Sequence, residues 1–265
     1  FIPSFIPLVE PLYSIKKSLM SETNTFHSEK FIIRASEVDI NGKVTLKSIC
    51  SFFQEVAGNN AKDLNFDITD LHENDRTWVL HRMDIKIDSF PKWRDTITIE
   101  TWPAAGDALR AYRNYRILDK QGIELGCCLS YWMMLNLKTR RPIRMTQEIL
   151  NTRLSKREHV LEVKSNRMSA ISNVENDISF TVRRSDLDMN LHVNNATYID
   201  WMLESLPLEE TTSITSFDIV YLHEGLEGDV ISSCKEIGTA GSLKLQLSNQ
   251  DGKTVALAEV SRELN

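Results

Sequence analysis

Residues 31–44 read FIIRASEVDINGKV and residues 180–193 read FTVRRSDLDMNLHV, and the two stretches align without a gap at a constant offset of 149. The Phe, Arg, Ser, Asp, Asn and final Val coincide, and most other pairs differ conservatively. Because apolar and polar positions match together, chance similarity is a poor explanation. The chain is therefore predicted to be an internal duplication.

Each matched stretch leads into apolar residues at helical spacing, and each predicted helix is followed by runs rich in β-branched and aromatic residues. Every half is therefore predicted to be an α+β unit, in which a long helix packs on a curved antiparallel β-sheet. The helical positions are Leu46, Ile49, Cys50, Phe53, Val56 and Ala57 in the first half, and Ala196, Ile199, Met202 and Leu203 in the second. The predicted strands are 78–90, 96–102, 109–118 and 123–136, then 216–222, 230–237, 243–247 and 254–262.

The domain boundaries follow from these patterns. We expect an N-terminal extension at 1–29, a first domain at 30–145, a polar linker at 146–177 and a second domain at 178–265. Prolines interrupt the apolar start of the chain at Pro3, Pro7 and Pro11, and no basic leader precedes it. Neither a signal peptide nor membrane insertion is expected.

Composition narrows the possible functions. The formal net charge of −6 argues against nucleic-acid binding, which needs a basic excess or a basic face. The histidines show no ligand spacing, so neither a metal nor a cofactor is expected. The cysteines also lack paired metal spacing, which indicates reduced core thiols and a cytoplasmic location. They are Cys50, Cys127, Cys128 and Cys234.

The two copies differ at polar positions. A second alignment, at an offset of 134, superimposes Asp84 on Asp218 and places Phe90 opposite Glu224, while the first alignment places Lys43 opposite His192. Only the second copy therefore has the complete set Asp188, Asn190, His192 and Glu224.

This set has the composition of a hydrolytic site. Histidine titrates near neutrality, and a nearby carboxylate can orient it or help it to activate water. An Asn amide beside a helix start can hold an oxyanion. Asp188 and Asn190 could equally build a turn, since both copies have them, and His192 alone could be a capping residue.

Residues 186–207, DLDMNLHVNNATYIDWMLESLP, together with WVLHRM at 78–83 and WMMLNLKTRR at 132–141, resemble the acyl-acyl carrier protein thioesterases. That family has tandem hot-dog domains and is known from plant plastids and bacteria, and the resemblance extends over residues 31–263. It implies hydrolysis of fatty acyl-acyl carrier protein, with release of the free fatty acid in fatty acid biosynthesis.

The resemblance also implies individual roles in the second domain. His192 and Glu224 would activate water, and Asn190 with helix amides would bind the thioester oxygen. Asp188 would orient the site or attack directly. In plant members a cysteine often follows the glutamate, but here that position is Gly225, so a thiol nucleophile is excluded at this place.

The resemblance assigns the acyl-chain pocket to the first domain. An acidic enzyme must bind the acidic carrier protein through a local basic patch. One candidate patch is Lys138, Arg140 and Arg141, and the alternative is Arg110, Arg113 and Arg116 along a predicted strand. The candidate lining residues are Ile49, Phe52, Phe53, Val56, Trp78, Met83 and Trp132, although each suits an ordinary core as well.

Two other functions fit the same residues. One is an acyl-CoA thioesterase, and the other is a catalytically silent acyl-binding module. Because a tandem supplies within one chain the pairing that single-domain relatives obtain by dimerising, we expect a monomer or a homodimer.

Overall fold

The computed structural model describes residues 25–104, 106–152, 154–171, 175–238 and 242–263. The first half contains β1 (His27–Ile32), η1 (Ala35–Glu37), α2 (Leu46–Asp63), α3 (Ile68–His72), β2 (Arg76–Ile87), β3 (Thr96–Ala104), β4 (Arg110–Leu118), β5 (Glu124–Asn136), β6 (Pro142–Ile143) and α4 (Gln147–Thr152). The second half contains β7 (Glu175–Thr181), η2 (Arg184–Asp186), α5 (Asn195–Leu203), α6 (Leu208–Thr211), β8 (Ile214–Tyr221), β9 (Val230–Ile237), β10 (Leu243–Asn249) and β11 (Thr254–Arg262).

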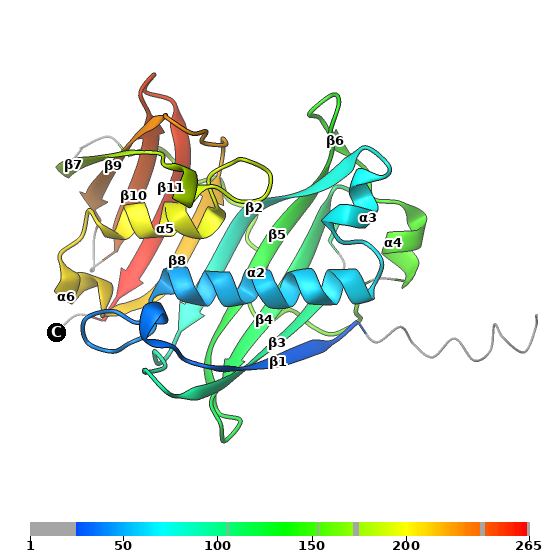
Figure 1. Cartoon of the computed structure of the whole chain (residues 1–265), viewed down its shortest axis with the longest axis horizontal. Helices are drawn as coiled ribbons and strands as arrows, with labels where there is room; N and C mark the ends of the chain where they lie inside the picture. Colours follow the sequence, from blue (N-terminus) through cyan, green and yellow to red (C-terminus); the bar gives the residue numbers. More distant parts are fainter. Residues whose placement is uncertain (1–24, 105, 153, 172–174, 239–241, 264–265) are drawn as a thin grey trace, which may run out of the picture.

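The strands of both halves form one antiparallel sheet, in the order β1-β3-β4-β5-β2-β8-β11-β10-β9-β7, with β6 paired to β5 (Figure 1). The second half repeats the order of the first in reverse, as a two-fold axis through the β2–β8 pair requires. Asp84 lies directly opposite Asp218, the residue that the sequence aligns with it. The predicted duplication and the two helix-on-sheet units are confirmed.

Charged side chains hold the β2–β8 junction together on the face opposite the helices. Asp218 accepts hydrogen bonds from Nε and Nη2 of Arg82, at 2.8 and 2.7 Å, and both side chains are buried. Lys164 Nζ lies 2.7 Å from Asp84 and 2.8 Å from Asp218. Burial raises the pKa of Asp84, and the Lys164 bond opposes this shift only in part. The stability of this buried carboxylate pair therefore depends on the charges of Arg82 and Lys164.

Lys164 belongs to the connection between the domains, which crosses the face of the sheet opposite α2. Leu161 and Val163 pack there against Tyr112, Leu129 and Tyr131. This connection is therefore anchored to the sheet by apolar contacts as well as by charge.

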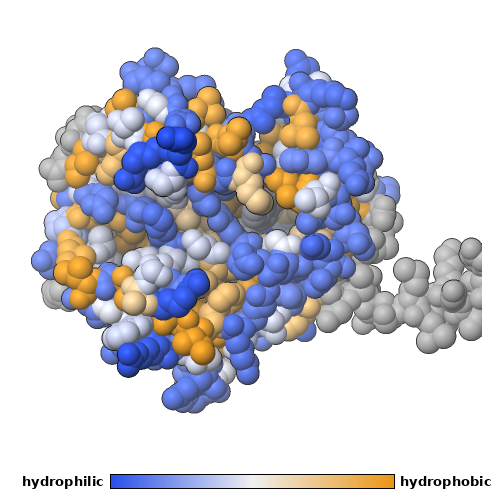
Figure 2. All heavy atoms as spheres, in the orientation of Figure 1, coloured by the Kyte–Doolittle hydropathy of each residue, from blue (hydrophilic) through white to orange (hydrophobic). Residues whose placement is uncertain are grey.

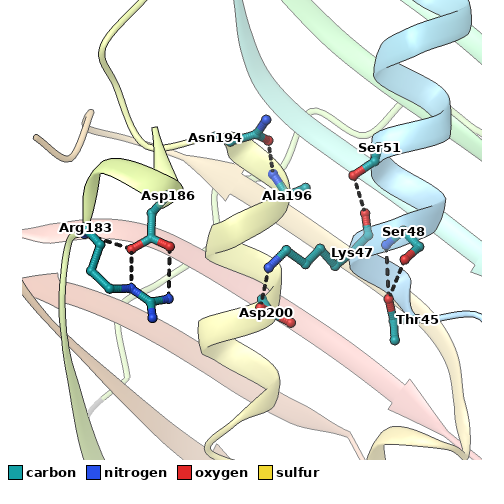
Figure 3. A network of polar contacts seen from close by, with 9 residues as sticks. All are labelled: Thr45, Lys47, Ser48, Ser51, Arg183, Asp186, Asn194, Ala196 and Asp200. Atoms are coloured by element: carbon teal, nitrogen blue, oxygen red, sulfur yellow. Dashed lines mark hydrogen bonds and ion pairs between the residues drawn. The ribbon is translucent and has the colours of Figure 1, made fainter. Parts of the chain in front are cut away.

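The helices α2 and α5 lie on the same face of the sheet and contact each other (Figure 1). Thr45 caps α2 by accepting a hydrogen bond from Ser48 N, and Asn194 caps α5 by accepting one from Ala196 N (Figure 3). An ion pair of 2.7 Å joins Lys47 of α2 to Asp200 of α5 (Figure 3). One continuous core cluster contains residues from both helices and both halves of the sheet.

Several element boundaries differ from the sequence-based ones. β1 begins at His27, inside the stretch predicted as an extension, and residues 1–24 of that extension lie outside the described part. The predicted linker includes the short helix α4 and the start of β7. The cysteines Cys50, Cys127, Cys128 and Cys234 are buried, as predicted.

We predict that Lys164→Met lowers the free energy of unfolding at pH 7 by about 1–3 kcal/mol, less than for a fully buried pair because Lys164 is 39% exposed. Burial disfavours the charge of Lys164, but the bonds to Asp218 and Asp84 outweigh it, so the pKa is raised. The lysine's contribution is therefore complete below its ordinary pKa of about 10.4 and is lost as pH rises through the folded-state value.

Denaturant unfolding at several pH values measures this difference, which should shrink above about pH 10.4. Lys156→Met is the matched control, because Lys156 is exposed on the same connection, and it should change stability by less than about 0.5 kcal/mol. Equal effects of the two substitutions would contradict the role given to Lys164.

Candidate active site

A tight polar turn precedes α5. Asp188 Oδ1 accepts hydrogen bonds from the backbone N–H of Asn190, at 2.8 Å, and of His192, at 3.3 Å. Leu191 takes a left-handed backbone conformation with φ of 63°. The Asp188 carboxylate thus holds the turn by binding backbone donors, and the turn presents His192 beside the helix start.

The first copy builds the same turn, with Lys43 in the place of His192. Asp39 Oδ1 accepts from Asn41 N and Lys43 N, at 2.8 and 2.9 Å, and Gly42 has φ of 72°. The structural interpretation of Asp188 is therefore correct as far as the turn is concerned. Phe90, which aligns with Glu224, is half-buried and packs against the core.

His192 and Glu224 meet beyond the end of β8. His192 Nε2 lies 3.4 Å from Glu224 Oε2, slightly beyond ordinary hydrogen-bond length, and both side chains are partly exposed. The backbone fixes their approach, because Val193 N donates to the Gly225 carbonyl at 3.0 Å. Distances of this kind commonly shorten when substrate binds.

Gly225 has a steric reason to be glycine. A Cβ atom there would lie 2.9 Å from Val193 Cγ2 and 3.1 Å from the Tyr198 hydroxyl, which accepts a hydrogen bond from Gly225 N at 2.7 Å. A side chain at this position would require the side chains of Val193 or Tyr198 to shift.

Arg140 reaches the same carboxylate from the first domain. It lies in the turn between β5 and β6, and its Nη2 forms an ion pair with Glu224 Oε2, the oxygen that also faces His192. The site is thus assembled from both copies. In the described residues Asp188 makes its side-chain contacts within its own turn, whereas His192, Glu224 and Arg140 converge.

These groups open onto a cavity of about 1020 Å³. Its walls come from α2, the start of α3, β2, β4 and β5 of the first domain, and from residues 188–195 and 221–224 of the second. Figure 2 shows the surface hollowed on the face that carries α2, with apolar side chains around the depression. A cavity of this size is typical of a site for a small or medium-sized ligand.

Of the candidate lining residues, Trp78 and Trp132 line this cavity. Hydrogen bonds hold both indoles, from Trp78 Nε1 to the Phe66 carbonyl at 3.0 Å and from Trp132 Nε1 to Ser130 Oγ at 2.7 Å. The other five lie in the core cluster and not among the lining residues; they are Ile49, Phe52, Phe53, Val56 and Met83.

The lining residues that the sequence did not single out as cavity residues include His81, His223 and Arg113. His81 lies at a bulge of β2 and bonds to the backbone of Tyr221, and its burial lowers its pKa. Burial and Lys253 also lower the pKa of His223. Arg113 is 5% exposed and donates to Asn60 Oδ1 at 2.8 Å. No local pattern in the sequence marks these three residues as cavity residues.

The basic residues fall into two groups. Lys138 and Arg141 are exposed near the cavity mouth, and Lys138 Nζ lies 2.5 Å from Asp75 Oδ2. The alternative patch along β4 is wrong, because Arg113 is buried in the domain and cannot bind a partner's surface. Its neighbours Arg110 and Arg116 form ion pairs with Asp107 and Glu124.

Within the described ranges, no three His, Cys, Asp or Glu side chains converge in a way that would hold a metal ion. None of the helices in those ranges combines the length and apolar character that a membrane crossing requires.

The helix-on-sheet tandem and its interdomain site define a double hot-dog protein. The family model for the acyl-ACP thioesterase N-terminal domain matches residues 24–152, and the model for the C-terminal domain matches residues 169–262. The chain belongs to the acyl-ACP thioesterase family.

Curated relatives agree with this placement. An oleoyl-acyl carrier protein thioesterase 2, chloroplastic, of Arabidopsis thaliana is 31% identical over 93% of this chain and 72% of its own length. An oleoyl-acyl carrier protein thioesterase, chloroplastic, of Coriandrum sativum is 33% identical over 81% of the chain, which spans only 63% of that relative. The cytoplasmic location expected for this chain stays a prediction.

Solved structures agree as well. An acyl-ACP thioesterase from Bacteroides thetaiotaomicron superimposes with a TM-score of 0.84 at 29% identity, covering 92% of this chain and 100% of that one. A 12:0-ACP thioesterase from Umbellularia californica gives 0.81 at 25% identity, covering 90% and 97%.

The equivalent turns allow a matched test of Asp188. We predict that Asp39→Ala and Asp188→Ala each lower the free energy of unfolding by about 0.5–2 kcal/mol, because each removes two bonds to backbone donors. Only Asp188→Ala should also lower the turnover of a thioester substrate. Thermal unfolding and initial rates measure the two effects, and equal activities of the two variants would make Asp188 purely structural.

Proposed function

We propose that this chain hydrolyses the thioester of fatty acyl-acyl carrier protein and releases the free fatty acid. The observation that carries the proposal is that His192 and Glu224 face each other at a cavity of about 1020 Å³ formed largely by the first domain. The acyl chain would occupy the cavity between α2 and the sheet, beside Trp78 and Trp132. The family membership supports this substrate class.

The chemistry follows from the placement of these groups. Glu224 and His192 take a proton from a water molecule, whose oxygen attacks the thioester carbonyl carbon. Asn190 and the amides at the start of α5 stabilise the oxyanion. The C–S bond then breaks, the sulfur receives the proton, and the products are a fatty acid and the carrier thiol.

In this scheme Asp188 is a positioning residue. Its Oδ1 accepts two backbone hydrogen bonds of the turn that presents His192, and its Oδ2 lies 3.4 Å from Asn190 Nδ2. Water is the nucleophile in the proposed reaction, and the absence of a side chain at Gly225 removes the alternative of a thiol there.

The carrier protein would bind through Lys138 and Arg141. Both side chains are exposed on the turn between β5 and β6, whose neighbouring residue Arg140 lines the cavity. Positive charge near the mouth attracts an acidic partner and increases the rate of encounter.

One test of the proposed function concerns the chemical step. His192→Ala and Glu224→Gln should each lower kcat on acyl-acyl carrier protein by about 100-fold or more, because each removes a proton-transfer group. Release of free thiol measures the rate, and circular dichroism checks folding. Lys43→Ala is the matched control, since Lys43 occupies the His192 position of the first copy; it should keep normal turnover. A wild type that cleaves no thioester would favour the acyl-binding module instead. If the two variants are as active as wild type, His192 and Glu224 are structural.

A second test concerns the substrate carrier. The double variant Lys138→Gln/Arg141→Gln should raise KM for acyl-carrier substrates by about 5- to 20-fold, with a smaller effect on the acyl-CoA of the same chain length. Lys120→Gln, which removes an exposed positive charge from the turn at the other end of β4 and β5, is the control and should leave both KM values unchanged. Equal changes with both substrates would contradict docking through this turn and would favour an acyl-CoA thioesterase.

A further inference from the structure

Glu224 has an unusual neighbour for a group that must accept a proton. Its carboxylate is partly exposed and Glu224 lies three residues beyond Tyr221, the last residue of β8, so no strand pairing fixes the side chain. Two groups contact it through Oε2, namely His192 Nε2 and the guanidinium of Arg140. One contact comes from each domain.

The backbone holds Arg140 in a defined place. Its φ is 56°, a left-handed conformation that non-glycine residues adopt only when neighbouring contacts impose it. Those contacts are the hydrogen bond from Arg140 N to the Asn136 carbonyl at 2.8 Å and the bond from Asn136 N to the Arg141 carbonyl at 3.0 Å. The turn therefore directs Arg140 differently from its basic neighbours Lys138 and Arg141.

We propose that Arg140 is a positioning residue of the catalytic centre, supplied by the first domain, which holds the Glu224 carboxylate against His192. This inference rests on the proposed function and assigns Arg140 to the reaction itself, whereas the sequence placed it in the docking patch.

Two physical effects follow from this contact. A guanidinium that binds one carboxylate oxygen restricts the rotamers of Glu224 and keeps Oε2 within reach of His192. Hydrolysis also converts an uncharged thioester into a fatty acid carboxylate beside Glu224. The product carboxylate and the Glu224 carboxylate repel each other when they are adjacent. The Arg140 guanidinium offsets this repulsion, both for the oxyanion and for the product.

The test uses Arg140→Ala in the full chain with acyl-acyl carrier protein as substrate. We expect kcat to fall by about 10- to 100-fold while KM changes by less than about threefold, because the lost contact serves the chemical step rather than docking. Arg140→Lys should retain an intermediate kcat, since it keeps the charge but loses the planar geometry.

Chemical rescue separates this role from a purely structural one. Arg140 is half exposed at the cavity mouth, so added methylguanidinium can reach the vacated position. It should restore at least about tenfold in kcat to Arg140→Ala and nothing to Glu224→Gln. Arg144→Ala is the control, because Arg144 is exposed just beyond β6 and is not among the lining residues of the cavity; it should show a normal kcat with no response to methylguanidinium.

A second readout does not depend on turnover. Calorimetric titration with a free fatty acid should show about 3- to 10-fold weaker binding to Arg140→Ala than to wild type, because the acid's carboxylate then faces Glu224 without a cation. The matching fatty alcohol, which carries no charge, should bind both proteins equally.

Three outcomes would overturn the inference. A raised KM for carrier substrates with unchanged kcat would make Arg140 a docking residue. A loss of kcat without rescue, together with a lower melting temperature, would make it structural. If wild type cleaves no thioester at all, the proposed function itself fails and Arg140 has no reaction to serve.

Discussion

The pairing of β2 with β8 is the constraint on which the rest of the molecule depends. It joins two helix-on-sheet units into one sheet, and it buries Asp84 opposite Asp218 at the two-fold axis. Two like charges there would repel, and Arg82 and Lys164 compensate them. Because this junction is held by both a strand pair and the connecting segment, α2 and α5 meet on the other face in a fixed relation. The cavity and its polar mouth exist only in that relation.

The repeat could be predicted from the sequence because the two copies share identical residues at equivalent positions. Most strand and helix positions followed from local periodicity. The joining of the two sheets into one could not be predicted. The pairing of β2 with β8 joins residues that are 130 or more positions apart, and no local pattern indicates it. Apolar character likewise could not separate Ile49, which lies in the core, from Trp78, which lines the cavity. The Arg140 contact with Glu224 crosses domains, and only its charge was visible beforehand.

The two copies show what the turn contributes and what the side chains on it add. Asp39 and Asp188 bind the same backbone donors, so the scaffold survives in both copies. Lys43 and Phe90 replace the histidine and the carboxylate in the first copy, and Phe90 has joined the hydrophobic core. The first copy thus supplies walls and a guanidinium to a polar centre located in the second.

The fusion of the two copies also changes how the protein can vary. In an association of two identical chains, every substitution appears twice, so a bulky residue that reshapes a binding wall also appears next to the reacting groups of the other subunit. Here a mutation in α2 or β2 occurs once. Substitutions can therefore enlarge or fill the volume beside Trp78 and Trp132 without changing the residues at 188–192 and 224. Changes in the cavity wall and changes in the polar centre arise in separate stretches of one gene.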